Sequence, residues 1–113
     1  MKLYNRRDFM GLPVGTVYSK GKQWYFGNLQ VFGGKFGDND FTCIEVAGIE
    51  AESSEDWVDK LEDMLKNGTS VPCDKDGYGR DGMYDNTDLF LVFEKEDLEH
   101  LSKIVNEAIE VTK

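Results

Sequence analysis

The fold of this chain is decided by a stretch that begins Asp74-Lys-Asp-Gly-Tyr-Gly-Arg-Asp-Gly-Met-Tyr-Asp-Asn-Thr-Asp88 and continues directly into Leu89-Phe-Leu-Val-Phe93. The first part, called the Gly/Asp loop below, is typical of an ordered loop, because glycine permits unusual backbone angles and aspartate bonds its own backbone. The second part is apolar at every position, without alternation. Such a run predicts a central strand that is covered on both faces.

Upstream of this stretch, three segments are typical of β-strands joined by short turns, because they are rich in aromatic and β-branched residues. They cover residues 15–19, 23–32 and 41–47. Gly27 interrupts the alternation of the second segment, which predicts a β-bulge there. Asn5 is a candidate cap for a short helical turn, which Gly11 and Pro13 then end. The three strands together predict an antiparallel meander.

Two segments carry the apolar spacing of amphipathic helices. Residues 54–67 place Trp57, Val58, Leu61, Met64 and Leu65 on one face, and residues 95–111 do the same with Leu98, Leu101, Ile104, Val105, Ala108 and Ile109. Ser53 or Ser54 is expected to cap the first helix, and Gly68 to end it. The sequence therefore predicts one α+β domain over residues 1–113. We expect an antiparallel sheet of about four to five strands packed against two helices.

The charge is uneven along the chain. The net charge is −9, but residues 1–35 carry six basic side chains against one aspartate, and the rest of the chain carries a balance of −14. Negative charge of this size repels nucleic acid and anionic membranes, so neither is expected as a direct partner. The acidic part predicts either a solvated surface or a surface that imitates a polyanion and competes for a basic groove on a partner.

Nothing in the sequence directs the chain to a membrane or a secretion route. No apolar run approaches the roughly 20 residues that a membrane helix needs, and residues 1–7 lead into no apolar signal region. We therefore expect a cytoplasmic protein, in which Cys43 and Cys73 are reduced thiols. A disulfide between them stays open at this stage, because it depends on geometry.

The Gly/Asp loop partly matches the twelve-residue calcium loop. With Asp74 at position 1, residues Asp76, Gly79 and Asp85 fall at positions 3, 6 and 12. Position 5, however, is Tyr78, position 12 lacks the longer glutamate, and a strand follows where a helix is required. We therefore expect no metal site in this loop.

Catalytic groups are sparse. His100 is the only histidine and lies off the apolar face of its helix, and no cysteine or serine stands in a nucleophile motif. Residues 33–37 match neither the phosphate loop nor the dinucleotide fingerprint, and they predict a hairpin turn. The sequence therefore predicts no catalytic residue, no cofactor and no enzymatic activity.

Aromatic and basic residues interleave in residues 18–25 and recur in the Gly/Asp loop. Planar rings beside Lys or Arg suit stacking on a nucleobase and contact with its phosphate. The candidate residues for binding a ligand or partner are Lys20, Lys22, Tyr25, Tyr78, Arg80 and Tyr84. Trp24 is instead expected to pack in the sheet. A purely structural role for the Gly/Asp loop is the alternative.

Two parts of the chain resemble small, mostly uncharacterised proteins encoded by bacteriophages. The first is Arg7-Asp-Phe9 followed by Leu12-Pro-Val-Gly-Thr-Val-Tyr18; the second is Asn67-Gly-Thr-Ser70 with Arg80-Asp-Gly82 and residues 89–94. The resemblance covers most of the chain and carries no site residues with it. It implies a viral accessory protein in the host cytoplasm, of a kind that often inhibits a host enzyme or anti-phage defence component.

Two modes of binding are open within that expectation. A protein-binding inhibitor would use the acidic helices over residues 54–67 and 95–111, whereas a protein that sequesters a small nucleotide signal would use the basic, aromatic N-terminal half with the Gly/Asp loop. A small enzyme is the third alternative. The sequence does not indicate an oligomeric state.

Overall fold

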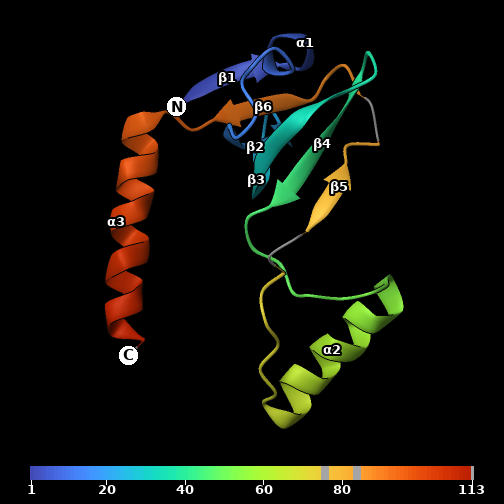
Figure 1. Ribbon diagram of the computed structural model, residues 1–113, viewed down its shortest axis with the longest axis vertical. Helices are drawn as coiled ribbons and strands as arrows, with labels where there is room; N and C mark the ends of the chain where they lie inside the picture. The colour runs from blue at the N-terminus through green and yellow to red at the C-terminus, as the bar shows by residue number, and fades with distance from the viewer. Residues whose placement is uncertain (75–76, 83–84, 113) are drawn as a thin grey trace.

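The computed structural model describes residues 1–74, 77–82 and 85–112, and Figure 1 shows how its elements are arranged. Within these residues, six antiparallel strands form one sheet in the order β1-β6-β2-β3-β4-β5. The strands are β1 (Lys2–Asn5), β2 (Val17–Lys22), β3 (Tyr25–Phe36), β4 (Asp40–Glu45), β5 (Tyr78–Arg80) and β6 (Leu89–Val92), and the helices are α1 (Arg6–Phe9), α2 (Ser54–Asn67) and α3 (Lys95–Val111). The α+β class and the antiparallel sheet are confirmed.

Strand β6 lies inside the sheet, because β1 and β2 pair with its two edges. Phe90 and Val92 are buried on one face, but Leu89 and Leu91 on the other face are only partly buried. The interior position was predicted correctly, and the expectation that both faces are covered was wrong. The sheet also contains β1 and β5, two short edge strands that the sequence pattern did not predict.

The core lies on the face of the sheet that α1 covers. Phe9 of α1 stacks on Phe90, with ring centroids 4.3 Å apart and an interplanar angle of 8°. The same Phe9 ring also contacts the rings of Tyr18, Phe32 and Phe41. Asn5 caps α1 as predicted, since its side-chain oxygen accepts a hydrogen bond from the Asp8 amide at 2.8 Å. One turn of helix thus carries the central ring of an aromatic core.

Two bulges bend β3. Gly21 pairs with Phe26 while Ser19 pairs with Leu29, so β3 holds one extra residue beside Gly27, as the interrupted alternation predicted. A second extra residue lies at Gly33, where a Cβ atom would collide with Thr42 Oγ1 and stand 3.1 Å from the Thr42 carbonyl oxygen. Only glycine fits this second position without a shift of β4.

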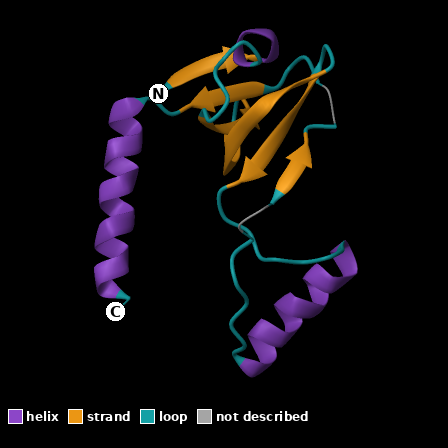
Figure 2. Cartoon of the chain, viewed as in Figure 1, coloured by secondary structure: helices purple, strands orange, loops and turns teal. Residues whose placement is uncertain are grey.

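Helices α2 and α3 extend away from the sheet, as Figures 1 and 2 show. Their bounds match the predicted residues, and Ser53 and Gly68 cap α2 as expected. None of the 14 residues of α2 or the 17 of α3, all of which the structure describes, is buried. The predicted packing of these helices on the sheet is therefore wrong, because an amphipathic pattern shows that one face suits burial without specifying what covers it.

None of the three helices, all of whose residues the structure describes, is long and apolar enough to cross a membrane.

Candidate functional site

The Gly/Asp loop meets α1 and β2 at a cluster of six charged side chains. This ion cluster consists of Arg6, Lys20, Lys22, Asp81, Asp85 and Asp88. Three cations thus face three carboxylates, and the cluster is neutral as a whole. Its members come from three segments that are far apart in the sequence, so the cluster ties the loop to the N-terminal half of the chain.

Arg6 occupies the buried part of the ion cluster and has only 5% of its surface exposed. Its Nη2 atom lies 2.6 Å from Asp81 Oδ2 and 2.9 Å from Asp88 Oδ2, and Nη1 donates to the Asn39 carbonyl at 3.0 Å. The guanidinium also lies 5.5 Å from the ring centroid of Phe90. Charge, hydrogen bonding and an aromatic surface therefore all hold this side chain in place.

The two lysines of β2 complete the cluster towards solvent. Lys20 Nζ lies 2.5 Å from Asp81 Oδ1 and 3.3 Å from Asp88 Oδ2. Lys22 Nζ lies 2.7 Å from Asp85 Oδ2, 2.8 Å from Asp88 Oδ1 and 2.8 Å from the Thr87 hydroxyl. Both lysines are on the core face of the sheet, because Lys20 pairs with Phe90 in direct register.

These contacts shift the pKa values in the directions that stabilise the charged forms. Burial opposes ionisation of Asp88, but hydrogen bonds from Lys22 and Arg6 outweigh it and lower the pKa of that carboxyl. Hydrogen bonds from Lys22 and Thr87 lower the pKa of Asp85. The same contact with Asp85, reinforced by Asp88, raises the pKa of Lys22. Burial likewise opposes the Arg6 charge, and its hydrogen bonds to the two aspartates raise its pKa.

The ion cluster is therefore a structural lock, since its charges neutralise one another. An anionic ligand would have to displace carboxylates from the lysines. Among the residues that the structure describes, no group of three or more His, Cys, Asp or Glu side chains is placed to hold a metal ion. Cys43 is buried and Cys73 is exposed, and both are free thiols.

The structure does not bring the sequence-predicted site residues into one place. Lys20 and Lys22 belong to the ion cluster, and Tyr25 pairs with Lys22 at the end of the β2–β3 hairpin. Tyr78 and Arg80 lie on edge strand β5, which β3 and β4 separate from β2. Tyr78 also lies on the opposite face of the sheet from the lysines, since it shares a row with Ile44, Val31 and Val17. Tyr84 lies outside the described residues.

Arg80 has partners of its own. Its Nε and Nη2 atoms lie 2.9 Å and 2.7 Å from Asp40 Oδ2, and its guanidinium stands 4.2 Å from the ring centroid of Phe36. The hydrogen bond from Arg80 lowers the pKa of Asp40. This pair ties β5 to the far end of β4, so the third predicted cation is also engaged within the fold.

Sequence reasoning placed Trp24 in the sheet, and the structure contradicts this. Trp24 is 86% exposed at the β2–β3 turn, beside the exposed ring of Tyr25. The alternation broken at Gly27 was the available signal, because residues before a bulge do not share the parity of those after it. Two aromatic rings thus stand at the tip of this hairpin.

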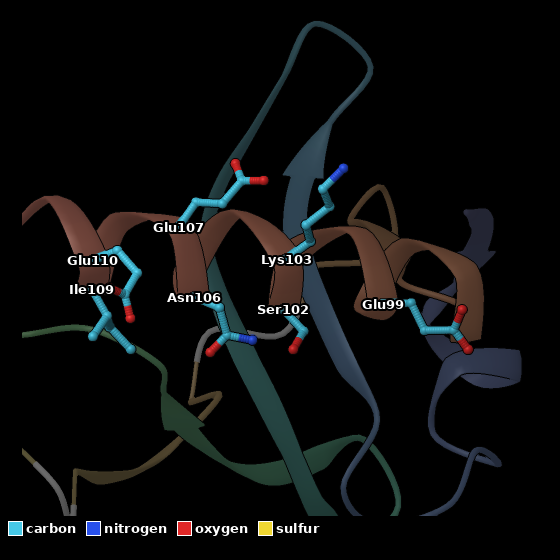
Figure 3. A pocket seen from close by; sticks show the side chains of 7 residues that line it. All are labelled: Glu99, Ser102, Lys103, Asn106, Glu107, Ile109 and Glu110. Atoms are coloured by element: carbon cyan, nitrogen blue, oxygen red, sulfur yellow. The ribbon is translucent and has the colours of Figure 1, made fainter.

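Helices α2 and α3, all of whose residues are described, have no buried residue. Figure 3 shows a shallow depression along one side of α3, lined by Glu99, Ser102, Lys103, Asn106, Glu107, Ile109 and Glu110. All seven residues come from one helix, so no second element forms a wall. The depression is an open helix surface rather than an enclosed binding cavity.

No protein-family model, curated protein or solved structure matches the chain. The resemblance to small bacteriophage proteins stays an expectation from the sequence.

Proposed function

We propose that this chain is a non-catalytic accessory protein that binds and inhibits a component of a bacterial host, with anti-phage defence as one such target, through the acidic surfaces of α2 and α3. The observation that carries the proposal is that both helices project from the sheet without a single buried residue. The connection to bacteriophages and to inhibition is supported by the sequence resemblance alone.

The chemistry of the helices fits a basic partner protein. Each helix carries five carboxylates against two lysines, and a concentration of one charge on a projecting element steers oppositely charged surfaces towards it. Exposed apolar side chains, among them Trp57 and Leu61, stand on the same helix as the carboxylates. Large apolar side chains of this kind act as anchors in protein interfaces, with charged groups around them. The helices thus provide carboxylates that attract a basic partner and apolar side chains that anchor it.

Sequestration of a nucleotide is the second candidate, and Trp24 and Tyr25 favour it. Two exposed aromatic rings at the tip of a hairpin provide the stacking surface that a nucleobase requires. The lysines nearby are neutralised by aspartates, however, and Arg80 is occupied on another strand. A thermal-shift screen with mono-, di- and cyclic nucleotides separates the candidates, since a ligand specific to the folded state raises the melting temperature.

The helix proposal is tested by capture of host proteins on the immobilised chain with two charge-matched variants. In the first, Glu55, Asp59 and Glu62 of α2 are replaced by their amides; in the second, Asp38, Glu45 and Glu50 outside the helices are replaced in the same way. All six side chains are exposed, and both variants have the same net charge. We expect the first variant to lose a host protein that wild type and the second variant retain.

Salt dependence provides an independent readout of the same proposal. Recognition between exposed charges weakens as the Debye length shrinks from about 10 Å at 0.1 M salt to about 3 Å at 1 M. The captured protein should therefore elute as salt is raised. Equal capture by both variants and by wild type would remove α2 from the proposal. A melting shift with a nucleotide that Tyr25→Ala abolishes would favour sequestration instead.

A further inference from the structure

The sheet has a second apolar face, opposite α1, and none of the three helices that the structure describes packs on it. Two cross-strand rows run across it in direct register. One row is Leu3, Leu91, Ser19 and Leu29, and the other is Val17, Val31, Ile44 and Tyr78. Leu3, Ile44 and Tyr78 are exposed, and the remaining apolar members are only partly buried. This surface, called the open face below, has the composition of a sheet face that packs against another layer.

The chain as a whole exposes more surface than a compact monomer of its size. Its accessible surface is 8316 Å², against about 6300 Å² expected for a folded monomer of this mass. Its radius of gyration is 16.0 Å, against about 13 Å expected for this length. The excess of about 2000 Å² belongs largely to an open sheet face and two helices that cover nothing.

We propose that the open face is covered by helix α3 of a second copy of this chain, so that two copies exchange helices in a symmetric dimer. The occupant is a second copy because one chain carries both halves of the contact: an uncovered sheet face and an uncovered amphipathic helix. A contact of this kind closes under two-fold symmetry, since each copy gives a helix and receives one. The inference goes beyond the proposed function and does not depend on it.

The dimensions of the two surfaces agree. Helix α3 has 17 residues and is therefore about 25 Å long, while six strands at ordinary spacing span about 24 Å. Its exposed apolar residues, Leu98, Ile104, Val105 and Ile109, extend over most of that length. Complete burial of the excess surface in both copies would amount to about 4000 Å², and a dimer in which α2 stays exposed buries the smaller part that belongs to α3 and the open face.

The N-terminal end of α3 is held so that the helix extends away from its own sheet. Only residues 93–94 separate β6 from α3, and Glu94 is the N-cap in a capping box with Asp97. The Glu94 amide donates to Asp97 Oδ2 at 2.8 Å, and Lys2 of β1 lies 3.8 Å from Glu94 Oε2. These contacts hold the start of the helix, and Figure 1 shows that α3 leaves the sheet there. The apolar side of α3 is therefore available to another molecule.

Charge favours the exchange over pairing between the helices. Both α2 and α3 have an excess of carboxylates, so helix–helix association sets like charges side by side. The two rows of the open face carry no charged residue. The apolar side of α3 can cover them while its carboxylates stay in water. The acidic surfaces that the proposed function requires remain outside in this dimer.

Sedimentation equilibrium of the purified chain tests the inference without any host component. We expect a species of twice the 12.9 kDa chain mass at micromolar concentration. Ile44→Lys on the open face and Ile104→Glu on α3 should each weaken the dimer by about 30-fold or more, as loss of an interface anchor does. Both side chains are exposed in one copy, at 40% and 48%, so both variants should fold, which circular dichroism checks. Leu65→Glu on α2 is the control and should leave the dimer intact.

Mixing the two interface variants distinguishes exchange from other dimers. In a mixed dimer, the intact α3 of the Ile44→Lys chain covers the intact open face of the Ile104→Glu chain. The mixture should therefore form dimers that neither variant forms alone at the same concentration. A monomeric wild type, whether compact or extended, overturns the inference. So does a dimer that resists both substitutions, or a mixture of the variants that stays monomeric.

Discussion

Replacing Arg6 with methionine is the sharpest test of the ion cluster as a structural lock. Methionine keeps much of the apolar stem and removes the guanidinium, so the aromatic core beside it loses little volume. The substitution leaves Asp81 and Asp88 without their arginine, although Lys20 still reaches both carboxylates and Lys22 still reaches Asp88. The Asn39 carbonyl also loses the donor at 3.0 Å.

The expected loss follows from these contacts. Removing one partner of a buried ion pair typically costs 3–5 kcal/mol, because the remaining charge stays in a poorly solvated place. Two lysines compensate part of the lost charge, so we expect the lower end, about 3 kcal/mol. That is a large share of the roughly 5–15 kcal/mol that holds a domain of this size together. In a thermal melt, the shift should be at least about 10 °C.

Urea unfolding at pH 7, followed by circular dichroism, measures the difference, with Arg7→Met as the matched control. Arg7 is the next residue of the same helix, and its side chain is 89% exposed, against 5% for that of Arg6. We expect Arg7→Met to change the free energy of unfolding by no more than about 0.5 kcal/mol. The two variants make the same chemical change at adjacent positions of one helix and differ in the burial of the side chain. The difference between their free energies of unfolding therefore measures the effect of the ion cluster.

A double variant separates the charge pair from general damage. In Arg6→Met combined with Asp88→Asn, the buried carboxylate that lost its arginine is neutral. The loss should therefore be smaller than the sum of the two single losses by about 1 kcal/mol or more. If Arg6→Met unfolds at the same urea concentration as Arg7→Met, or if the two losses simply add, the ion cluster does not stabilise the fold as a structural lock.

Two further predictions concern pH and the second bulge. The pKa values of Asp85 and Asp88 are lowered and that of Lys22 is raised, so their contribution to stability is present from about pH 5 to about pH 10. It is lost as the pH falls from about 5 through the folded carboxylate pKa values, or rises through the folded lysine pKa. The gap in unfolding free energy between wild type and Lys22→Gln should therefore shrink on acidification, whereas a gap that widens contradicts the assignment. Gly33→Ala should destabilise the fold by about 1–3 kcal/mol, because the added Cβ meets Thr42. Gly79→Ala is the control, since a Cβ atom there has no atom within 4 Å. Equal urea midpoints for the two variants would contradict this packing.

Local patterns predicted the elements whose causes are local. The α2 and α3 bounds follow from apolar spacing and caps within one segment, and the bulge at Gly27 follows from a break in alternation. Strands β1 and β5 were missed because they are short edge strands whose pairing is decided elsewhere. β1 pairs with β6, which lies far from it in the sequence. Residues 2–5 are extended because of this pairing, in which Leu3 lies opposite Leu91.

The candidate site shows the same limit in its charges. Lys20 and Lys22 looked available because a sequence displays cations without their partners, and those partners are 61 to 68 positions away. Arg6 was not singled out at all, although it lies 75 and 82 positions from its two aspartates. No spacing rule reaches that far. The partners of these cations are aspartates of the Gly/Asp loop, and only the folded structure shows that they form ion pairs.

The division between the core and the helices has a consequence for where recognition can reside. The core consists of residues of α1, its C-cap Met10 and the strands, and no residue of α2 or α3, both fully described, belongs to it. The sheet can therefore keep its fold while the helices change. An exposed apolar stripe is nevertheless a liability in water, because it promotes association. Partners that cover the two apolar stripes would account for their exposure beside so many carboxylates. The Gly/Asp loop then has a structural role, and α2 and α3 are the proposed contact surfaces.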